Sequence, residues 1–160
     1  MPLTVVEVDN ATALAGPLFK QTFGHAIPEF PRHFVAFHYG VEAPLRVVAY
    51  IHYTAWESHG WLCGGLCVDR NAYAVAGAEE ADAWKREGGV GEIVLRNTLA
   101  RLVDRPVIFG YCGNARQWQH DLNVGFVPAG PPHLLVIWTR PVAPAEQERL
   151  IQRVVALGQF

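Results

Sequence analysis

A glycine-rich segment, Arg86-Glu87-Gly88-Gly89-Val90-Gly91, has the residue types and spacing of an anion-binding turn in this 160-residue chain. It lies where a loop is expected to end and a helix to begin. Glycine lets a backbone approach a ligand closely, and the unpaired N–H groups of a first helical turn direct partial positive charge at an anion. The segment therefore predicts a pyrophosphate site, although glycines before a helix also serve ordinary turns.

Three cysteines and seven histidines raise the question of a metal site or a thiol nucleophile. Cys63 and Cys67 stand four residues apart on an expected strand, which places their sulfurs on one face but about 13 Å apart. One tetrahedral zinc ion cannot bridge that distance, so we expect no metal. No order of cysteine, histidine and aspartate typical of a nucleophilic site is recognisable, and Cys67 is expected to be a packed or cofactor-facing residue.

Length and composition limit the classes of protein that the chain can represent. With 51% apolar and 18% charged residues, one domain over 1–160 can bury an ordinary core. A net charge of -2 gives no positive field for nucleic acid. The sparse, odd cysteines indicate a reducing compartment, and neither a leader pattern nor a run of about 18 apolar residues is present. We therefore expect a cytoplasmic protein without nucleic-acid or membrane partners.

The elements that must position the glycine-rich segment follow from apolar periodicity and turn residues. Expected strands cover 3–8, 33–39, 46–56, 61–68, 107–112, 126–128 and 133–139, expected helices cover 11–23, 71–87, 92–103, 115–124 and 144–157, and expected turns cover 40–44 and 57–60. The crossover from 61–68 to 107–112 requires parallel pairing. Three consecutive strands before the glycines argue against a Rossmann fold. We expect an α/β (α+β) fold with a mixed, mostly antiparallel twisted sheet of six to seven strands flanked by helices.

Three features in sequence order resemble the GNAT superfamily of N-acetyltransferases. Arg86, Gly89 and Gly91 occupy the fixed places of the pattern Arg or Gln, any two residues, Gly, any residue, Gly or Ala, which holds the pyrophosphate of coenzyme A in that superfamily. Leu66-Cys67-Val68 resembles the strand segment that hydrogen-bonds the pantetheine arm. Asn114 precedes a helix that ends in Gly125-Phe126, as in the family. The resemblance spans roughly 45–139.

The resemblance implies a GNAT-like acyl-CoA N-acyltransferase fold with acetyl-CoA as co-substrate. The cofactor-binding residues that it implies are Leu66, Cys67, Val68, Arg86, Glu87, Gly88, Gly89, Val90, Gly91 and Asn114. It also implies direct attack of a neutral amine on the thioester, with a backbone N–H of 66–68 polarising the acetyl carbonyl.

The residue at the position of the proton donor to the thiolate differs from the family pattern. The family often places a tyrosine four residues before the terminal glycine, where this chain has Asp121. An aspartate is ionised near neutral pH and cannot donate unless burial raises its pKa. We therefore take His120 as the first candidate acid and Tyr111 as the second. A coenzyme thiol is acidic enough that the reaction can also proceed without a dedicated acid.

The sequence also does not identify the residue that accepts a proton from the amine. Many family members carry a carboxylate just before the position that matches Leu66, where this chain has glycines at 64 and 65. Glu57, His52 and His59 stand near the end of the neighbouring strand and could reach the cleft. A solvated turn for Glu57 and His59, and an ordinary strand position for His52, are the plainer interpretations.

The acceptor and the oligomeric state are not encoded in any motif. The segment between the strand and the glycines is long, and its helix with Tyr73 and Trp84 either forms a wall of the acceptor site or covers the sheet edge. Two functions stay open: transfer of the acetyl group to a primary amine of a small molecule or protein, and a non-catalytic acyl-CoA-binding or regulatory module. The apolar face of the last helix could pack on a second subunit, so a homodimer is possible.

Overall fold

The structure is a computed structural model that describes residues 3–40 and 44–160. Its elements in chain order are β1 (Thr4–Val8), α1 (Thr12–Phe23), β2 (Arg32–His38), β3 (Arg46–Trp56), β4 (Gly60–Cys63), β5 (Cys67–Val68), α2 (Ala72–Val75), α3 (Ala78–Arg86), α4 (Val90–Leu99), β6 (Val107–Tyr111), α5 (Ala115–Asn123), β7 (Val127–Pro128), β8 (Leu134–Trp138) and α6 (Pro144–Leu157). Most of the turn expected over 40–44 lies outside the described residues. The bounds predicted for β3 and α6 are confirmed.

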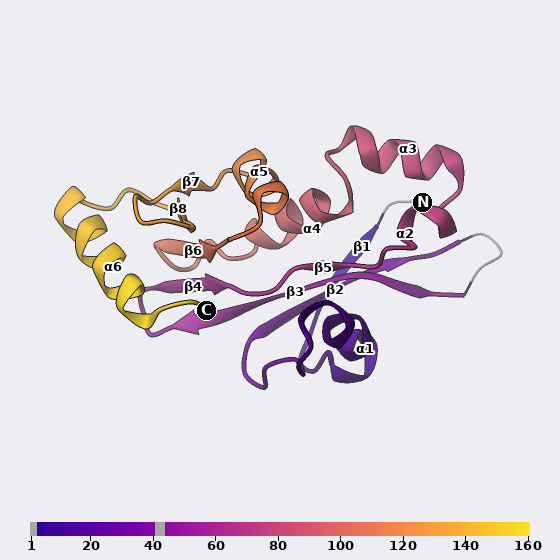
Figure 1. The fold of residues 1–160 in the computed structure, drawn as a ribbon, viewed down its shortest axis with the longest axis horizontal. Coiled ribbons are helices and arrows are strands. Elements are labelled where there is room, and N and C mark those ends of the chain that lie inside the picture. The colour runs from indigo at the N-terminus through magenta and orange to yellow at the C-terminus, as the bar shows by residue number, and fades with distance from the viewer. Residues whose placement is uncertain (1–2, 41–43) are drawn as a thin grey trace.

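The strands form a single mixed sheet, which confirms the predicted fold class. Their order is β1-β2-β3-β4-β6-β8-β7, and β5 pairs with β3 beside this path. The β4–β6 pair is parallel, as the crossover required, and the other pairs are antiparallel. Figure 1 shows α1 on one side of the long strands and α3, α4 and α5 on the other. The helices therefore cover both faces of the sheet.

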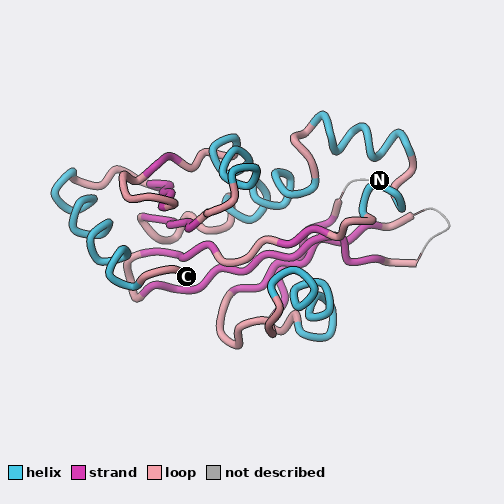
Figure 2. Tube along the Cα trace, viewed as in Figure 1, coloured by secondary structure: helices cyan, strands magenta, loops and turns pink. Residues whose placement is uncertain are grey.

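Within the described residues the sheet has eight strands rather than six or seven, because the prediction of a single strand over 61–68 is wrong. β4 pairs with both β3 and β6, whereas β5 pairs with β3 alone. The register against β3 also moves by one residue between the Tyr53–Cys63 pair and the Tyr50–Cys67 pair. Gly64 and Gly65 stand at this irregularity, where the absence of a side chain permits a bulge. Figure 2 shows the loop that separates the two short strands alongside β3.

The single helix expected over 71–87 is also wrong, because the chain forms the short α2 and then α3. Gly77 separates them with an extended backbone (ψ 157°), as glycine is a poor helix former. α4 begins two residues earlier than expected, at Val90, because Gly89 is the last residue in a loop conformation and stands at the N-cap position. It ends at Leu99 instead of Val103, although Leu102 in the following turn stays buried.

Three apolar clusters hold the helices on the sheet. One joins β-strand residues with α4, the second joins α1 with Tyr50 and Cys67, and the third joins α6 with β6 and β8. Burial of this apolar area is the main stabilising contribution. Within the described parts of the chain, none of the helices has both the length and the apolar character needed to span a bilayer.

Candidate functional site

Two adjoining pockets open where the chain beyond β4 no longer pairs with β6. The inner pocket has a volume of about 310 Å³, and its lining is Thr22, Phe23, Cys63, Gly64, Gly65, Leu66, Leu95, Gly110, Tyr111, Cys112, Gly113, Asn114, Gln117, Asp121 and Phe126. The outer pocket has a volume of about 520 Å³, and its lining is Thr22, Leu66, Cys67, Val68, Asp69, Arg70, Tyr73, Gly88, Gly89, Val90, Gly91, Asn114, Arg116, Gln117 and His120. The shared residues make the two pockets one continuous cleft.

The glycine-rich segment forms the loop that begins α4. Gly88 and Gly89 both have φ of +94°, a conformation that side chains other than glycine rarely adopt. Gly91 faces β5: a Cβ there would lie 3.5 Å from Leu66 Cδ2 and 3.9 Å from Val68 Cγ2. The missing side chain thus leaves the first turn of α4 close to this strand. The positive end of the α4 helix dipole consequently borders the outer pocket. The N–H groups of Gly88 and Gly89 donate to the carbonyls of Lys85 and Trp84, and that of Val90 donates to the Tyr73 hydroxyl.

The structure brings together eight of the ten residues predicted for the cofactor. Those that line the outer pocket are Leu66, Cys67, Val68, Gly88, Gly89, Val90, Gly91 and Asn114. Arg86 and Glu87 are exposed and are not part of this lining. Glu87 contributes its backbone carbonyl, which accepts a hydrogen bond from Arg96 at 2.6 Å. The Oδ1 atom of Asn114 accepts hydrogen bonds from the N–H groups of Arg116 and Gln117, so this residue also caps α5.

Charged residues that the motif did not indicate lie around the outer pocket. Arg70 and Arg116 belong to its lining, and both are exposed. Lys85 and Arg116 also line a neighbouring cavity of about 330 Å³ with Tyr73, Gly88 and Gly89. Arginine and lysine side chains attract phosphate oxygens. The sequence shows that these basic residues exist, but only the fold shows which basic side chains face the glycine loop.

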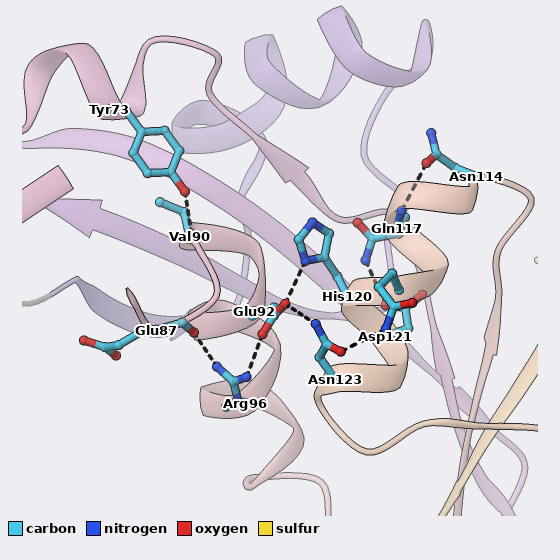
Figure 3. Close-up of polar contacts among 11 residues, drawn as sticks. Tyr73, Glu87, Val90, Glu92, Arg96, Asn114, Gln117, His120, Asp121 and Asn123 are labelled. Carbon is cyan, nitrogen blue, oxygen red and sulfur yellow. Dashed lines mark hydrogen bonds and ion pairs between the residues drawn. The ribbon is translucent and has the colours of Figure 1, made fainter. Parts of the chain in front are cut away.

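His120 projects from α5 into the outer pocket and is held by a buried carboxylate. Its Nδ1 atom lies 2.8 Å from Glu92 Oε1, and Glu92 also accepts hydrogen bonds from Arg96 at 2.6 Å and Asn123 at 2.9 Å (Figure 3). Burial raises the pKa of Glu92, but the hydrogen bonds from Asn123, His120 and Arg96 outweigh it, so the pKa lies below its usual range. Glu92 therefore acts as an ionised centre that orients His120 beside the glycine loop.

Asp121 and Tyr111 both line the inner pocket. Asp121 is buried and accepts a hydrogen bond from the Gln117 side chain at 2.8 Å (Figure 3). Burial raises the pKa of this carboxyl, and the hydrogen bond from Gln117 opposes the shift only in part. The shift is in the direction that a proton-donating aspartate requires. Tyr111 is half-buried, and its ring lies 5.8 Å from that of His133.

The cysteines are packed thiols. All three are unpaired, and Cys67 is buried against α1 while lining the outer pocket. Burial raises the pKa of Cys67 to about 12, and that of Cys63 still higher, so both are protonated near neutral pH. A protonated thiol is a weak nucleophile, which agrees with a packing or cofactor-facing role for Cys67.

The candidates for a base are separated by the fold. Glu57 and His59 lie in the β3–β4 connection, where Glu57 pairs with Arg153 of α6 at 2.8 Å. Neither residue lines the inner or the outer pocket. His52 is buried on β3 behind Gly64 of the inner pocket. Among the three, only His52 adjoins the wall of the cleft.

The segment before the glycine loop contributes one residue to the cleft and one to the core. Tyr73 lines the outer pocket, and its hydroxyl accepts a hydrogen bond from the Val90 N–H at 3.0 Å (Figure 3). Trp84 is buried behind it, with 5.8 Å between the two ring centroids. The segment therefore borders the glycine loop and, through Trp84, covers the sheet.

Comparison with known proteins identifies the fold. No protein-family model and no curated protein matches the sequence. A GNAT-family acetyltransferase from Brucella melitensis, crystallised with acetyl-CoA, superposes with a TM-score of 0.54 at 14% identity, over 89% of this chain and 92% of that one. Ribosomal-protein-S5-alanine acetyltransferase from Vibrio fischeri gives 0.55 at 10% identity, over 89% and 96%. Ard1 from Thermoplasma volcanium gives 0.55 at 12% identity, over 88% and 100%. The chain has the fold of the GNAT acetyltransferases.

Proposed function

We propose that the chain is an acetyl-CoA-dependent N-acetyltransferase that passes the acetyl group to a primary amine by direct attack. The observation that carries the proposal is the outer pocket, in which β5, the glycine loop and Asn114 share one lining. Residues far apart in the sequence meet there, and they include eight of the ten that the resemblance implied for the cofactor. The fold supports the same activity, because solved acetyltransferases share it.

The cleft suggests how acetyl-CoA lies. Its diphosphate would lie against the first turn of α4, at the positive end of the helix dipole, with Arg70 and Arg116 supplying positive charge. The pantetheine arm would run along β5, and the thioester would enter the inner pocket beside Leu66, which belongs to both linings. The small side chains in the inner pocket leave room for an acetyl group and an amine.

The reaction needs a proton path at both ends. The amine nitrogen forms a bond to the acetyl carbon, the carbon–sulfur bond breaks, and the thiolate takes a proton while the amine loses one. His120 and Tyr111 are the proposed donors to the thiolate, from the outer and the inner pocket respectively. Asp121 joins them as a third candidate, because it lies in the inner pocket and burial raises its pKa.

A non-catalytic acyl-CoA-binding module is the second candidate function. It is favoured by the two glycines at 64 and 65, which leave the inner pocket without the carboxylate that many members of the family carry just before this strand position. In such a module, ligand occupancy would act as a signal and the acetyl group would stay on the thiol.

The proposal extends to the location, the acceptor and the oligomeric state of the protein. A cytoplasmic location is consistent with three unpaired cysteines. A small-molecule amine or an exposed protein amine is the proposed acceptor, and nucleic acid and membrane are not proposed as partners. A homodimer would use the half-exposed apolar side chains Val155 and Leu157 of α6.

Free-thiol release from acetyl-CoA across an amine panel tests the proposal. Polyamines, aminoglycosides, amino acids and peptides with free N-termini or lysines would each be offered to the purified protein. Turnover with at least one class supports the transferase. Tight binding of acetyl-CoA without turnover on the full panel supports the binding module instead.

A further inference from the structure

Asp121 is a buried carboxyl group without a basic partner. Its residue is 8% exposed, and it forms no salt bridge with any residue that the structure describes. The other buried carboxylate among those residues, Glu92, pairs with Arg96 and His120. Buried charges in proteins are normally paired, because water no longer solvates them. Asp121 therefore differs from Glu92 in having no cation of its own.

The inner pocket gives a cation access to this carboxyl group. Asp121 belongs to its lining, and none of the described residues in that lining is a lysine, an arginine or a histidine. Asp121 is also the only carboxyl group among them. A pocket with one carboxyl group and no basic side chain favours a positively charged ligand and repels a carboxylate. An alkylamine, with a pKa of about 10.4 for a lysine-like group, has this charge near neutral pH.

A neighbour on α5 holds the carboxyl group in place. Gln117, one turn earlier, donates from Nε2 to Asp121 Oδ1 at 2.8 Å and itself lines both pockets. Figure 3 shows His120 turned toward Glu92 and Asp121 paired with Gln117. These two successive residues of α5 thus serve different parts of the cleft. His120 lines the outer pocket, and Asp121 lines the inner pocket, into which the thioester is proposed to enter.

Burial also changes the acid–base character of this carboxyl group. It raises the pKa of Asp121, and the hydrogen bonds that the carboxyl group accepts oppose the shift only in part. Three further titratable groups lie near it, Cys63, Cys112 and Tyr53, and burial raises the pKa of each, so that they are neutral near pH 7. A base whose pKa is closer to neutrality can both take up and return a proton during turnover.

We propose that Asp121 binds the acceptor as an ammonium ion in the inner pocket and removes one of its protons. The inference rests on the proposed acetyltransferase function and supplies a proton acceptor for the amine. Loss of the proton frees the lone pair of the nitrogen, which attacks the acetyl carbon. The carbon–nitrogen bond forms, the carbon–sulfur bond breaks, and the protonated Asp121 returns its proton to the thiolate. The new amide nitrogen releases its extra proton to water, so Asp121 ends the cycle ionised.

The test compares acceptors that differ in basicity. 2-Phenylethylamine is an ammonium ion near neutral pH, whereas O-benzylhydroxylamine has nearly the same size and is neutral there. Any other acceptor from the amine panel is paired with its aminooxy analogue in the same way. We expect Asp121→Asn to lower kcat/KM at least about tenfold for the alkylamine and no more than about threefold for the aminooxy compound, which needs no deprotonation before attack. Acetyl-CoA affinity, measured by calorimetry, should stay within about twofold.

Asp104→Asn is the matched control, because Asp104 accepts a hydrogen bond from Trp61 and lines neither pocket. It removes the same charge and should leave kcat/KM for both compounds within about twofold. An equal loss for both compounds in Asp121→Asn would overturn the inference, since a structural role, or a role at the thiolate alone, would affect both alike. An unchanged kcat/KM for the alkylamine would overturn it as well.

A comparison on the wild-type protein covers the case in which Asp121→Asn does not fold. Phenylalaninamide and phenylalanine have nearly the same size and differ in the charge beside the amine, and another acceptor is compared with its own α-carboxylate. We expect kcat/KM to be at least about tenfold lower for the carboxylate, which would lie beside Asp121. Equal values, or a preference for the carboxylate, would contradict the inference.

The proposed function is tested separately by the same preparation. Wild-type protein that fails to bind acetyl-CoA would overturn the proposed function. Wild-type binding of acetyl-CoA without turnover of any amine would overturn both the transferase activity and the role inferred for Asp121.

Discussion

The hydroxyl of Tyr73 accepts a hydrogen bond from the backbone N–H of Val90 at 3.0 Å, which ties the segment after β5 to the first turn of α4. A hydroxyl that accepts in this way keeps its own hydrogen free to donate. Because Tyr73 lines the outer pocket beside Gly89, that hydrogen can reach an anion held by the loop. The tyrosine thus occupies the Val90 N–H and can offer its own hydrogen in place of that donor.

Removing this hydroxyl should weaken cofactor binding. Tyr73→Phe is expected to reduce acetyl-CoA affinity about threefold to tenfold, because one hydrogen bond to the diphosphate is lost. Calorimetry with acetyl-CoA measures the effect, and acetyl-pantetheine, which lacks the diphosphate, is the control ligand whose affinity should not change. An unchanged or higher affinity for acetyl-CoA would mean that the hydroxyl only competes for the Val90 amide.

The contribution of Glu92 to the free energy of unfolding should depend on pH. Its pKa is lowered in the folded state, so its contribution is present above the unfolded value of 4.5 and is lost as pH falls through the folded value. Glu92→Gln should reduce the free energy of unfolding at pH 7 by about 1–3 kcal/mol. The difference from wild type should shrink on acidification below the unfolded value.

Urea unfolding at a series of pH values measures this difference. Glu146→Gln, which removes a surface pair with Arg149, is the control and should change stability little. A Glu92→Gln difference that stays constant down to the acid transition would show that the carboxylate is not the titrating group.

Asp121 should show opposite effects on stability and on activity. Its pKa is raised by burial, so the charged form costs stability as pH rises above the usual aspartate value. Asp121→Asn should therefore raise the free energy of unfolding at pH 7. If the carboxyl donates the proton to the thiolate, thiol release should fall at least about tenfold.

Thermal unfolding and turnover on the same preparation decide the role of Asp121. A variant that is more stable but equally active would leave the donor role to His120 or Tyr111. The same measurements on His120→Gln and Tyr111→Phe then rank the remaining two. A less stable Asp121→Asn variant would contradict the account of its burial.

Two glycines should respond to alanine with opposite signs. A Cβ on Gly60 would lie 2.5 Å from the Val107 carbonyl oxygen on the parallel neighbour β6, so Gly60→Ala should cost about 1–3 kcal/mol. Gly16 lies inside α1, where a Cβ would meet Thr12 at an ordinary 3.8 Å. Gly16→Ala should stabilise by about 0.5–1 kcal/mol. Denaturant unfolding compares them, and a Gly60→Ala variant as stable as the wild type would contradict the described packing of β4 on β6.

Much of the fold could be predicted from local patterns, since long periodic segments specify their own element. β3 and α6 were predicted residue for residue, and the parallel β4–β6 pair followed from the crossover. The break between β4 and β5 could not be predicted, because an apolar run with two glycines reads equally as one strand. Which neighbour each half pairs with depends on β6, about forty residues later in the sequence.

The sequence motifs could predict which segments border the cleft, and the roles of their residues stay predictions. The glycine loop, β5 and Asn114 lie in one pocket. Arg70 and Arg116 were missed, and Tyr73 was considered for the acceptor site rather than for the glycine loop, because these positions depend on which side chains the fold brings to the loop. Asp121 was set aside because its intrinsic pKa does not suit an acid. Burial raises the pKa of this carboxyl, and burial is known only once the chain is folded.

Calorimetric titration of the purified protein with acetyl-CoA and with coenzyme A tests the central claim most directly. We expect one site per chain for each ligand, with weaker binding in the presence of competing pyrophosphate. No heat of association with either ligand, or binding that pyrophosphate does not affect, would contradict the assignment of the glycine loop as the diphosphate site.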